Sequence, residues 1–203
     1  MTATPRPLTI GVLALQGAYD AHAKTLTALG ASPRLVRVPQ ELQGLDGLIM
    51  PGGESTTMLK FLERNGFFSI LQTWVRTTPT FGTCAGAILL ATHVENPPQR
   101  SLAALDITVE RNAYGRQIDS TILTAPTAIP GGPLEMVFIR APRIRSTGPN
   151  VETLATRDGF PTLVRSGHLL AATFHPELSH DPRVHQLFLD QVRQHKAASI
   201  QRS

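Results

Sequence analysis

An apolar run at residues 8–15 constrains the fold of this chain more than any other feature of its sequence. A run of that length without polar alternation is typical of a strand that is buried on both faces of a parallel sheet. A helical stretch over residues 18–29 follows and stops at Gly30, and two more short strands are predicted at residues 34–38 and 46–50. Strands that alternate with helices in this way indicate a parallel α/β sheet.

The C-terminal half has a different pattern, in which short strands follow one another with little helix between them. Asp158-Gly159 is typical of a hairpin turn, and Asp181-Pro182 begins a final amphipathic helix. We therefore expect a three-layer α/β fold, with a mostly parallel central sheet flanked by helices and antiparallel strands added in the C-terminal half. The strands of this half are predicted at residues 106–111, 117–124, 135–140, 151–156, 161–165 and 169–174.

Composition limits the class of protein. With 203 residues and 41% hydrophobic content the chain can bury one core, which predicts a single domain over residues 1–203 with frayed ends at 1–7 and 197–203. The one cysteine excludes an intramolecular disulfide, and no stretch resembles a signal or membrane segment, so we expect a reducing, cytoplasmic setting without membrane contact. The net charge is +4, but the arginines are dispersed and aromatic residues make up only 5%, which argues against nucleic-acid binding.

The single cysteine lies in the segment Phe81-Gly82-Thr83-Cys84-Ala85-Gly86, between a predicted strand and a predicted helix at residues 85–91. A strand-to-helix turn of this kind holds its central residue in a strained conformation with an exposed side chain, and the flanking glycines let strand and helix approach closely. The helix N-terminus favours the thiolate form of the side chain, which a nucleophile requires. A buried structural cysteine is the alternative interpretation of this segment alone.

A second glycine-rich turn, Pro51-Gly52-Gly53-Glu54-Ser55-Thr56-Thr57, follows the strand at residues 46–50 and precedes a helix that either Ser55 or Thr56 could cap. Its unobstructed amides suit a carboxylate or a developing oxyanion, although an ordinary strand-to-helix turn explains the pattern equally well. Both turns come at the carboxyl ends of predicted parallel strands. That edge is where open α/β sheets bind ligands.

A cysteine nucleophile needs a base and a group that orients the base, so each of the seven histidines is a candidate. His175 follows the apolar strand at residues 169–174, and in an extended segment His175 and Glu177 project to the same side. Together with the turn at Cys84, this spacing predicts a Cys-His-Glu triad. The other histidines are weaker candidates: His22, His185 and His195 are expected on helix surfaces, His93 at the end of the helix after Cys84, and His168 and His180 without a carboxylate behind them.

Six blocks of sequence, in matching order, resemble the glutaminase subunits of pyridoxal 5′-phosphate synthase, which are class I, triad-type glutamine amidotransferases. The similarity extends from Leu8 to Lys196. Six ordered blocks are far more specific than one short motif. The blocks are Gly11-Val12-Leu13-Ala14-Leu15-Gln16-Gly17, Pro51-Gly52-Gly53-Glu54-Ser55-Thr56-Thr57-Met58, Phe81-Gly82-Thr83-Cys84-Ala85-Gly86, Glu110-Arg111-Asn112-Ala113-Tyr114-Gly115-Arg116-Gln117, Phe138-Ile139-Arg140-Ala141-Pro142 and Phe174-His175-Pro176-Glu177-Leu178.

The resemblance implies hydrolysis of L-glutamine to L-glutamate and ammonia, and delivery of the ammonia to a separate synthase subunit that builds pyridoxal 5′-phosphate. It implies no cofactor and no metal. By position in the matching blocks, Cys84 is the nucleophile, His175 the general acid and base, and Glu177 the group that orients His175. The residues implied to contact glutamine are Gly53, Glu54, Ser55, Arg111, Ile139 and Arg140, and those implied to offer amides to the oxyanion are Ala85, Gly52 and Gly53.

Three other functions are compatible with parts of the sequence. The chain could be the glutaminase of another synthase, such as imidazole glycerol phosphate synthase, although the blocks at residues 110–117 and 138–142 argue against it. It could be a catalytically silent binding subunit, which the complete Cys-His-Glu set argues against. A small cysteine hydrolase or peptidase that works without a partner is the third alternative.

Overall fold

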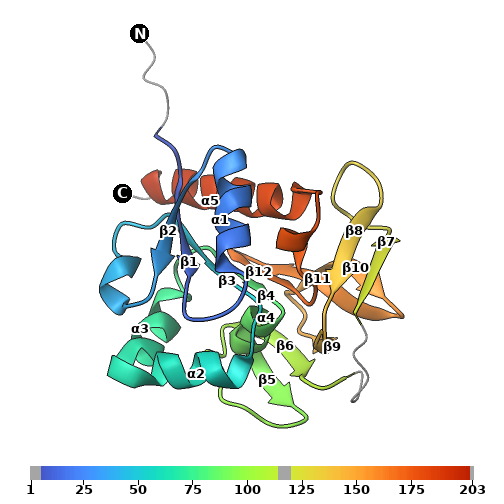
Figure 1. Ribbon diagram of the computed structural model, residues 1–203. Helices are drawn as coiled ribbons and strands as arrows, with labels where there is room; N and C mark the ends of the chain where they lie inside the picture. The colour runs from blue at the N-terminus through green and yellow to red at the C-terminus, as the bar shows by residue number, and fades with distance from the viewer. Residues whose placement is uncertain (1–5, 114–119, 202–203) are drawn as a thin grey trace.

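The computed structural model describes residues 6–113 and 120–201, and seven strands of this described part form the central sheet (Figure 1). The strand order is β10-β11-β12-β4-β3-β1-β2. Neighbours are parallel from β2 to β12, whereas β11 is antiparallel to both β12 and β10. The predicted mostly parallel sheet with antiparallel strands from the C-terminal half is confirmed. The bounds are β1 Thr9–Leu13, β2 Ser32–Val36, β3 Gly47–Met50, β4 Thr80–Thr83, β10 Glu152–Arg157, β11 Phe160–Ser166 and β12 Leu169–Ala172.

Helices cover both faces of this sheet and complete the predicted three layers (Figure 1). α1 (Tyr19–Ala28) and α5 (Arg183–Ile200) lie on one face, and α2 (Ser55–Glu63), α3 (Phe67–Trp74) and α4 (Ala85–Leu90) lie on the other. Short 3₁₀-helices occupy Pro39–Leu42 (η1), Arg64–Gly66 (η2) and Pro176–Leu178 (η3).

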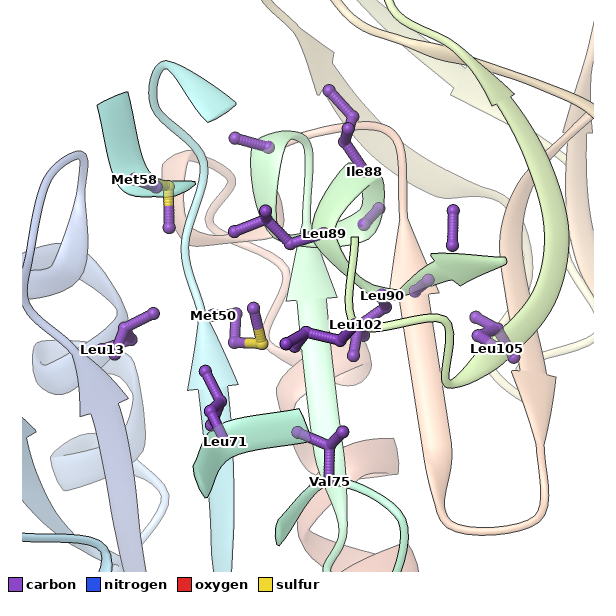
Figure 2. Close-up of a cluster of buried hydrophobic side chains, with 14 of the residues drawn as sticks. Leu13, Met50, Met58, Leu71, Val75, Ile88, Leu89, Leu90, Leu102 and Leu105 are labelled. Carbon is purple, nitrogen blue, oxygen red and sulfur yellow. The ribbon is translucent and has the colours of Figure 1, made fainter. Parts of the chain in front are cut away.

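Alternating side chains of the strands pack into two hydrophobic cores, one on each face of the sheet. Val12 of β1 belongs to the core under α1 and α5, and Leu13 belongs to the core under α2, α3 and α4. Figure 2 shows the second core, with Met50 of β3 between Leu71 of α3 and Leu89 of α4 in this view. These side chains are fully buried, and each such burial contributes about 1.5–3 kcal/mol to folding. The two cores hold the sheet edge that carries the site in a fixed position.

Several strands of the C-terminal half do not join the central sheet as predicted. Among the described residues, β5 (Ala91–Glu95), β6 (Leu105–Glu110) and β9 (Arg143–Thr147) form a separate sheet, and β7 (Thr121–Ala125) pairs with β8 (Leu134–Phe138). Neither β5 nor β9 is predicted from the sequence. The start of the strand predicted at residues 117–124, and the end of the block at residues 110–117, lie outside the described residues.

The placement of His93 at the end of a helix is wrong, because α4 ends at Leu90 and His93 lies in β5. The chain becomes extended at Ala91, where ψ is 147°. The Thr92 hydroxyl then donates a hydrogen bond of 2.9 Å to the Leu105 carbonyl and ties β5 to β6. Pairing with a distant strand overrides the local helical composition, and the local pattern contains no sign of that pairing.

The last helix begins as the sequence predicts and ends later. The Asp181 carboxylate accepts a hydrogen bond of 3.0 Å from the backbone N–H of Arg183, at the start of α5. The helix continues through residues 197–200, a stretch that the sequence assigns to a frayed end. No helix within residues 6–113 and 120–201 combines the length and apolar character needed to cross a membrane.

Two glycines let α4 lie directly on β3 and β4. A Cβ atom at Gly82 would meet the backbone of Gly86, and a Cβ atom at Gly86 would meet the carbonyl oxygen of Met50. Both obstacles are backbone atoms, which cannot rotate away as a side chain can. The close approach predicted from the glycines that flank Cys84 is therefore confirmed, and it fixes the start of α4 against the sheet edge.

We expect Gly86→Ala to lower the free energy of unfolding by about 1–3 kcal/mol, because the added methyl group forces α4 away from Met50. Urea unfolding measures the loss. Gly132→Ala is the control, since its added Cβ would meet nothing within 4 Å and only its φ of 85° opposes the change. If Gly86→Ala loses no more stability than Gly132→Ala, α4 can move away from the sheet without cost.

Candidate active site

The carboxyl ends of β3, β4 and β12 lie side by side at one edge of the central sheet. β4 pairs in parallel with β3 on one side and with β12 on the other. The segments that follow these strands carry Gly52, Cys84 and His175. Parallel pairing therefore brings together three residues that are far apart in the sequence, as expected for an open α/β sheet.

Cys84 occupies the tight turn between β4 and α4. Its φ of 47° and ψ of −103° are unusual for a residue with a side chain, and such a conformation costs on the order of 1–3 kcal/mol. Its backbone N–H donates a hydrogen bond of 2.8 Å to the Ala172 carbonyl of β12, which helps to hold the turn. The strained conformation agrees with the sequence prediction. The expected exposure does not, because Cys84 is only 7% exposed and faces a pocket rather than open solvent.

His175 and Glu177 form a close pair directly after β12. The distance between His175 Nδ1 and Glu177 Oε1 is 2.7 Å, and the Glu177 side chain is completely buried. The predicted partners therefore meet, but not in an extended segment, because residues 176–178 form the 3₁₀-helix η3. The backbone N–H of His175 donates a hydrogen bond of 2.8 Å to the Val137 carbonyl, which anchors the turn to β8.

The surroundings of His175 favour its protonated form. Burial alone lowers the pKa of the imidazole, but hydrogen bonds with Cys84 and Glu177, and the charges of both groups, raise it to about 10. A cysteine nucleophile requires an imidazolium beside its sulfur, because that charge stabilises the thiolate form. The structure thus brings Cys84, His175 and Glu177 together, with His175 bonded to Glu177 and lining the same pocket as Cys84.

The turn after β3 must lack side chains for His175 to fit. A Cβ atom at Gly52 would collide with the His175 ring and would also crowd Cys84. A Cβ atom at Gly17, whose φ is 88°, would collide with the Gly52 carbonyl oxygen. The backbone of the glycine turn therefore packs directly against the His175 ring and lies beside Cys84.

A pocket of about 290 Å³ opens above Cys84 and His175. Its size is near the lower end for small-molecule sites, which suits a ligand no larger than an amino acid. All six residues implied to contact glutamine line it, whereas Glu177, Gly52 and Ala85 do not. The lining residues are Gln16, Gly53, Glu54, Ser55, Cys84, Ile88, Arg111, Asn112, Ile139, Arg140, Pro142 and His175.

A charged pair borders this pocket. Glu54, rather than Ser55 or Thr56, caps α2: its carboxylate accepts hydrogen bonds from the N–H groups of Thr56 (3.0 Å) and Thr57 (2.7 Å). Partial burial raises the pKa of Glu54, but these bonds and one from the Thr57 hydroxyl lower it to about 2. Arg111 lies 3.6 Å from Glu54 and donates a hydrogen bond of 2.7 Å to the Thr56 hydroxyl. At the start of α2 the pocket thus presents the anion of Glu54 beside the cation of Arg111.

Sequence reasoning missed four residues that line the pocket, namely Gln16, Ile88, Asn112 and Pro142. Gln16 follows β1, and its side-chain oxygen accepts a hydrogen bond of 3.2 Å from the Glu54 N–H. Because β1 is parallel to β3, its carboxyl end lies at the same edge, so the predicted topology could have identified Gln16. Asn112 adjoins the predicted Arg111, and Pro142 lies two residues after the predicted Arg140.

The expectation that His22 and His185 lie on helix surfaces is wrong, because both are fully buried. His22 projects from α1 and His185 from α5, and their rings lie 2.9 Å apart from Nδ1 to Nε2. His22 Nε2 is 3.3 Å from Oε2 of Glu177, directly behind the predicted triad. A helical periodicity could have revealed the position of His22, which is four residues before the buried Leu26 on the same helix face.

The sequence matches the SNO glutamine amidotransferase family over residues 12–194. It is 61% identical to the pyridoxal 5′-phosphate synthase subunit PdxT of Koribacter versatilis (strain Ellin345), over 91% of this chain and 95% of that protein. It is 50% identical to the subunit of the same name from Thermotoga sp. (strain RQ2), over 91% of this chain and 99% of that protein.

Solved structures with the same fold include one described as a glutamine amidotransferase. It superposes with a TM-score of 0.84 at 44% identity, over 90% of this chain and 98% of that chain. A glutamine amidotransferase from Thermotoga maritima superposes with a TM-score of 0.58 over 95% of this chain and 86% of that one, at 11% identity, which is a likeness of fold alone. The class I glutamine amidotransferase fold expected from the sequence is therefore confirmed.

The two buried histidines should make folding sensitive to acid. Burial lowers the pKa of His185 to about 4, and burial together with the charges of His185 and His175 lowers the pKa of His22 well below its usual value. The unfolded chain, with histidine pKa values of about 6.5, therefore binds protons first. The stability that the two neutral histidines contribute is fully present above about pH 6.5 and is lost as the pH falls toward 4. For His185 alone the loss is roughly 2 kcal/mol at about pH 5.

We expect His185→Phe, which keeps a ring in the same space, to lose less stability than the native chain between about pH 7.5 and about pH 5. Urea unfolding at the two pH values measures the difference. An unchanged pH dependence in the variant would show that His185 binds protons equally in the folded and unfolded chains.

Proposed function

The chain belongs to the SNO glutamine amidotransferase family, and we propose that it hydrolyses L-glutamine with Cys84 as the nucleophile, His175 as the general acid and base, and Glu177 as the group that orients His175. It is the glutaminase subunit that provides ammonia for pyridoxal 5′-phosphate synthesis, which agrees with its glutamine amidotransferase family and with relatives named pyridoxal 5′-phosphate synthase subunit PdxT. The observation that carries the assignment of residues is the placement of His175, which is bonded to Glu177 at 2.7 Å and lines the same pocket as Cys84.

The geometry supports a two-step reaction. The Cys84 thiolate attacks the carboxamide carbon of glutamine and forms a C–S bond, and the carbonyl oxygen becomes an oxyanion. His175 gives its proton to the amide nitrogen and the C–N bond breaks. Ammonia leaves, and a thioester with Cys84 remains. Water then attacks the thioester while His175 accepts the proton of that water. The C–S bond breaks, and glutamate and the thiolate are released.

The oxyanion is assigned to backbone amides on two sides of the sulfur. Ala85 is the first residue of α4, so its N–H has no partner within the helix. Gly52 lies next to Cys84 and His175, and Gly53 lines the pocket. Amides that are held by a helix start and by a packed glycine turn need little rearrangement when the charge develops.

The charges around the pocket suit the amino-acid end of glutamine. Arg111 and Arg140 provide cations for the α-carboxylate, and the Glu54 carboxylate, which stays ionised because its pKa is about 2, provides an anion for the α-ammonium group. Ser55 and Ile139 complete the contacts around the side chain. With both ends held, the carboxamide is directed toward Cys84.

The partner in this proposal is a separate synthase subunit, since the relatives are named as subunits of pyridoxal 5′-phosphate synthase. We assign the whole chain to one glutaminase domain, and we place it in the cytoplasm, where a reducing environment preserves the single catalytic thiol. A glutaminase that serves another synthase is the second candidate. The identity of 61% over 91% of the chain to a PdxT subunit favours the first.

We expect Cys84→Ala to abolish ammonia release from glutamine, and Glu177→Gln to reduce it on the order of 10³–10⁴-fold, because the orienting carboxylate is lost. His168→Asn is the control: His168 is bonded to the Val75 carbonyl, away from the pocket, and its loss should leave the rate unchanged. Ammonia release is measured with and without the separate synthase subunit that is the proposed partner of this chain.

Activity should be low for the chain alone and should rise when the synthase subunit is added. Equal ammonia release in both conditions would contradict the partner-dependent part of the proposal. Full activity in Cys84→Ala would contradict the mechanism itself.

We expect Arg111→Met to raise the KM for glutamine about 10–100-fold with a small change in kcat, because a charge-assisted bond to the substrate is lost in ground and transition states alike. Arg145→Met is the matched control, since Arg145 is on β9, pairs with Glu110 and does not line the pocket. Steady-state kinetics over a range of glutamine concentrations separates the two constants. A fall in kcat at unchanged KM would contradict the assignment of Arg111 to substrate binding.

A further inference from the structure

A second layer of buried polar side chains lies behind the proposed triad. His22 of α1 and His185 of α5 face each other in the core, and Thr83 of β4 lies against them, with its hydroxyl oxygen 3.3 Å from His22 Nε2. All three residues are fully buried. Within the described residues, no three His, Cys, Asp or Glu side chains are grouped so as to hold a metal ion. The histidines therefore need another explanation than a metal site.

The unusual feature is the second oxygen of Glu177. Oε1 is bonded to His175 at 2.7 Å, but Oε2 is buried and has no hydrogen-bond partner within the described residues. The nitrogen that faces it is His22 Nε2, at 3.3 Å. A buried carboxylate oxygen without a donor is costly, so the proton on His22 decides whether this contact is favourable.

Both histidines are neutral at ordinary pH, since burial lowers their pKa values. A neutral imidazole has one N–H and one bare nitrogen, and the short contact between His22 Nδ1 and His185 Nε2 requires one of each. Two arrangements satisfy that contact. In one, His22 carries its proton on Nδ1, and in the other on Nε2.

The first arrangement fails on two counts. It would turn the lone pair of His22 Nε2 toward the carboxylate of Glu177, and it would leave the proton of His185 on Nδ1, a buried atom without a partner among the described residues. The second leaves only a bare acceptor at that atom, which proteins tolerate more readily than a buried N–H. In it, His185 Nε2–H donates to His22 Nδ1, and His22 Nε2–H points between Thr83 and Glu177.

We propose that His22, held in this tautomer by His185, is a positioning residue that donates a hydrogen bond to Oε2 of Glu177 and so fixes the carboxylate against His175. The two atoms are 3.3 Å apart without a formed hydrogen bond in this structure, and hydrogen bonds around a catalytic group are often long or poorly aligned before substrate binds. The inference rests on the proposed role of Glu177. It extends the series from Cys84 through His175 and Glu177 to two helices on the opposite side of the sheet from α4.

The tautomer can be tested in the native chain. The ¹⁵N chemical shifts of the histidine rings distinguish a proton on Nε2 from one on Nδ1. We expect His22 and His185 both to carry the proton on Nε2 at neutral pH. A proton on His22 Nδ1 would overturn the proposal, and this outcome does not depend on the folding of any variant.

The function can be tested with two variants that match in length and volume, His22→Gln and His22→Met. Glutamine keeps an N–H near the position of Nε2, and methionine does not. Because Cys84 is the single cysteine of the chain, its alkylation by iodoacetamide as a function of pH reports the activated thiol without background. The experiment needs no glutamine, so it stands apart from any failure of the proposed substrate.

We expect alkylation at neutral pH to fall about tenfold in His22→Met, with its midpoint moved to higher pH, and to return to within about threefold of the native rate in His22→Gln. Thermal unfolding of both variants measures any loss of stability. If His22 only fills space, the two variants will share the native pH profile. That result, or an equal loss of reactivity in both, would overturn the proposal. Glutaminase assays on the native chain test the proposed function separately.

Discussion

The parallel pairing of β4 with β3 and β12 is the constraint on which the site depends. It places Gly52, Cys84 and His175 at one edge although they come from different parts of the chain. The pairing is maintained by two cores on opposite faces and by a helix that lies on the sheet with no side chain between them, at Gly82 and Gly86. The strained backbone of Cys84 is tolerated because its surroundings leave it no other conformation.

The sequence is most informative where structure is local. The apolar run at residues 8–15, the glycine turns and the Asp181-Pro182 start of α5 each carry their own signal, and the architecture built from them is correct. The failures have a common cause in long-range contacts. β5 and β9 exist because they pair with β6, and His22 and His185 are buried because two helices converge behind Glu177. The separate sheet of β5, β6 and β9 cannot be inferred from its local patterns.

The electrostatics of the site follow from burial combined with directed hydrogen bonds. Burial alone would lower the pKa of His175 and favour its neutral form, yet its interactions with Cys84 and Glu177 raise the pKa and favour the imidazolium. The same burial keeps His22 and His185 neutral. One fold therefore favours the protonated form of His175 and the neutral forms of His22 and His185. The difference depends on hydrogen bonding, because Glu177 is bonded to His175 and to neither of the other two histidines.

The position of β12 in the sheet has a consequence for biosynthesis. Cys84 leaves the ribosome with the first half of the chain. The Ala172 carbonyl of β12 accepts a hydrogen bond from the Cys84 N–H, and His175 follows β12, so both arrive only late in synthesis. β4 is then an unpaired edge on that side until the C-terminal segment arrives. The thiol meets His175 only when β12 inserts between β4 and β11, so a truncated or incompletely folded chain has the cysteine without the histidine beside it.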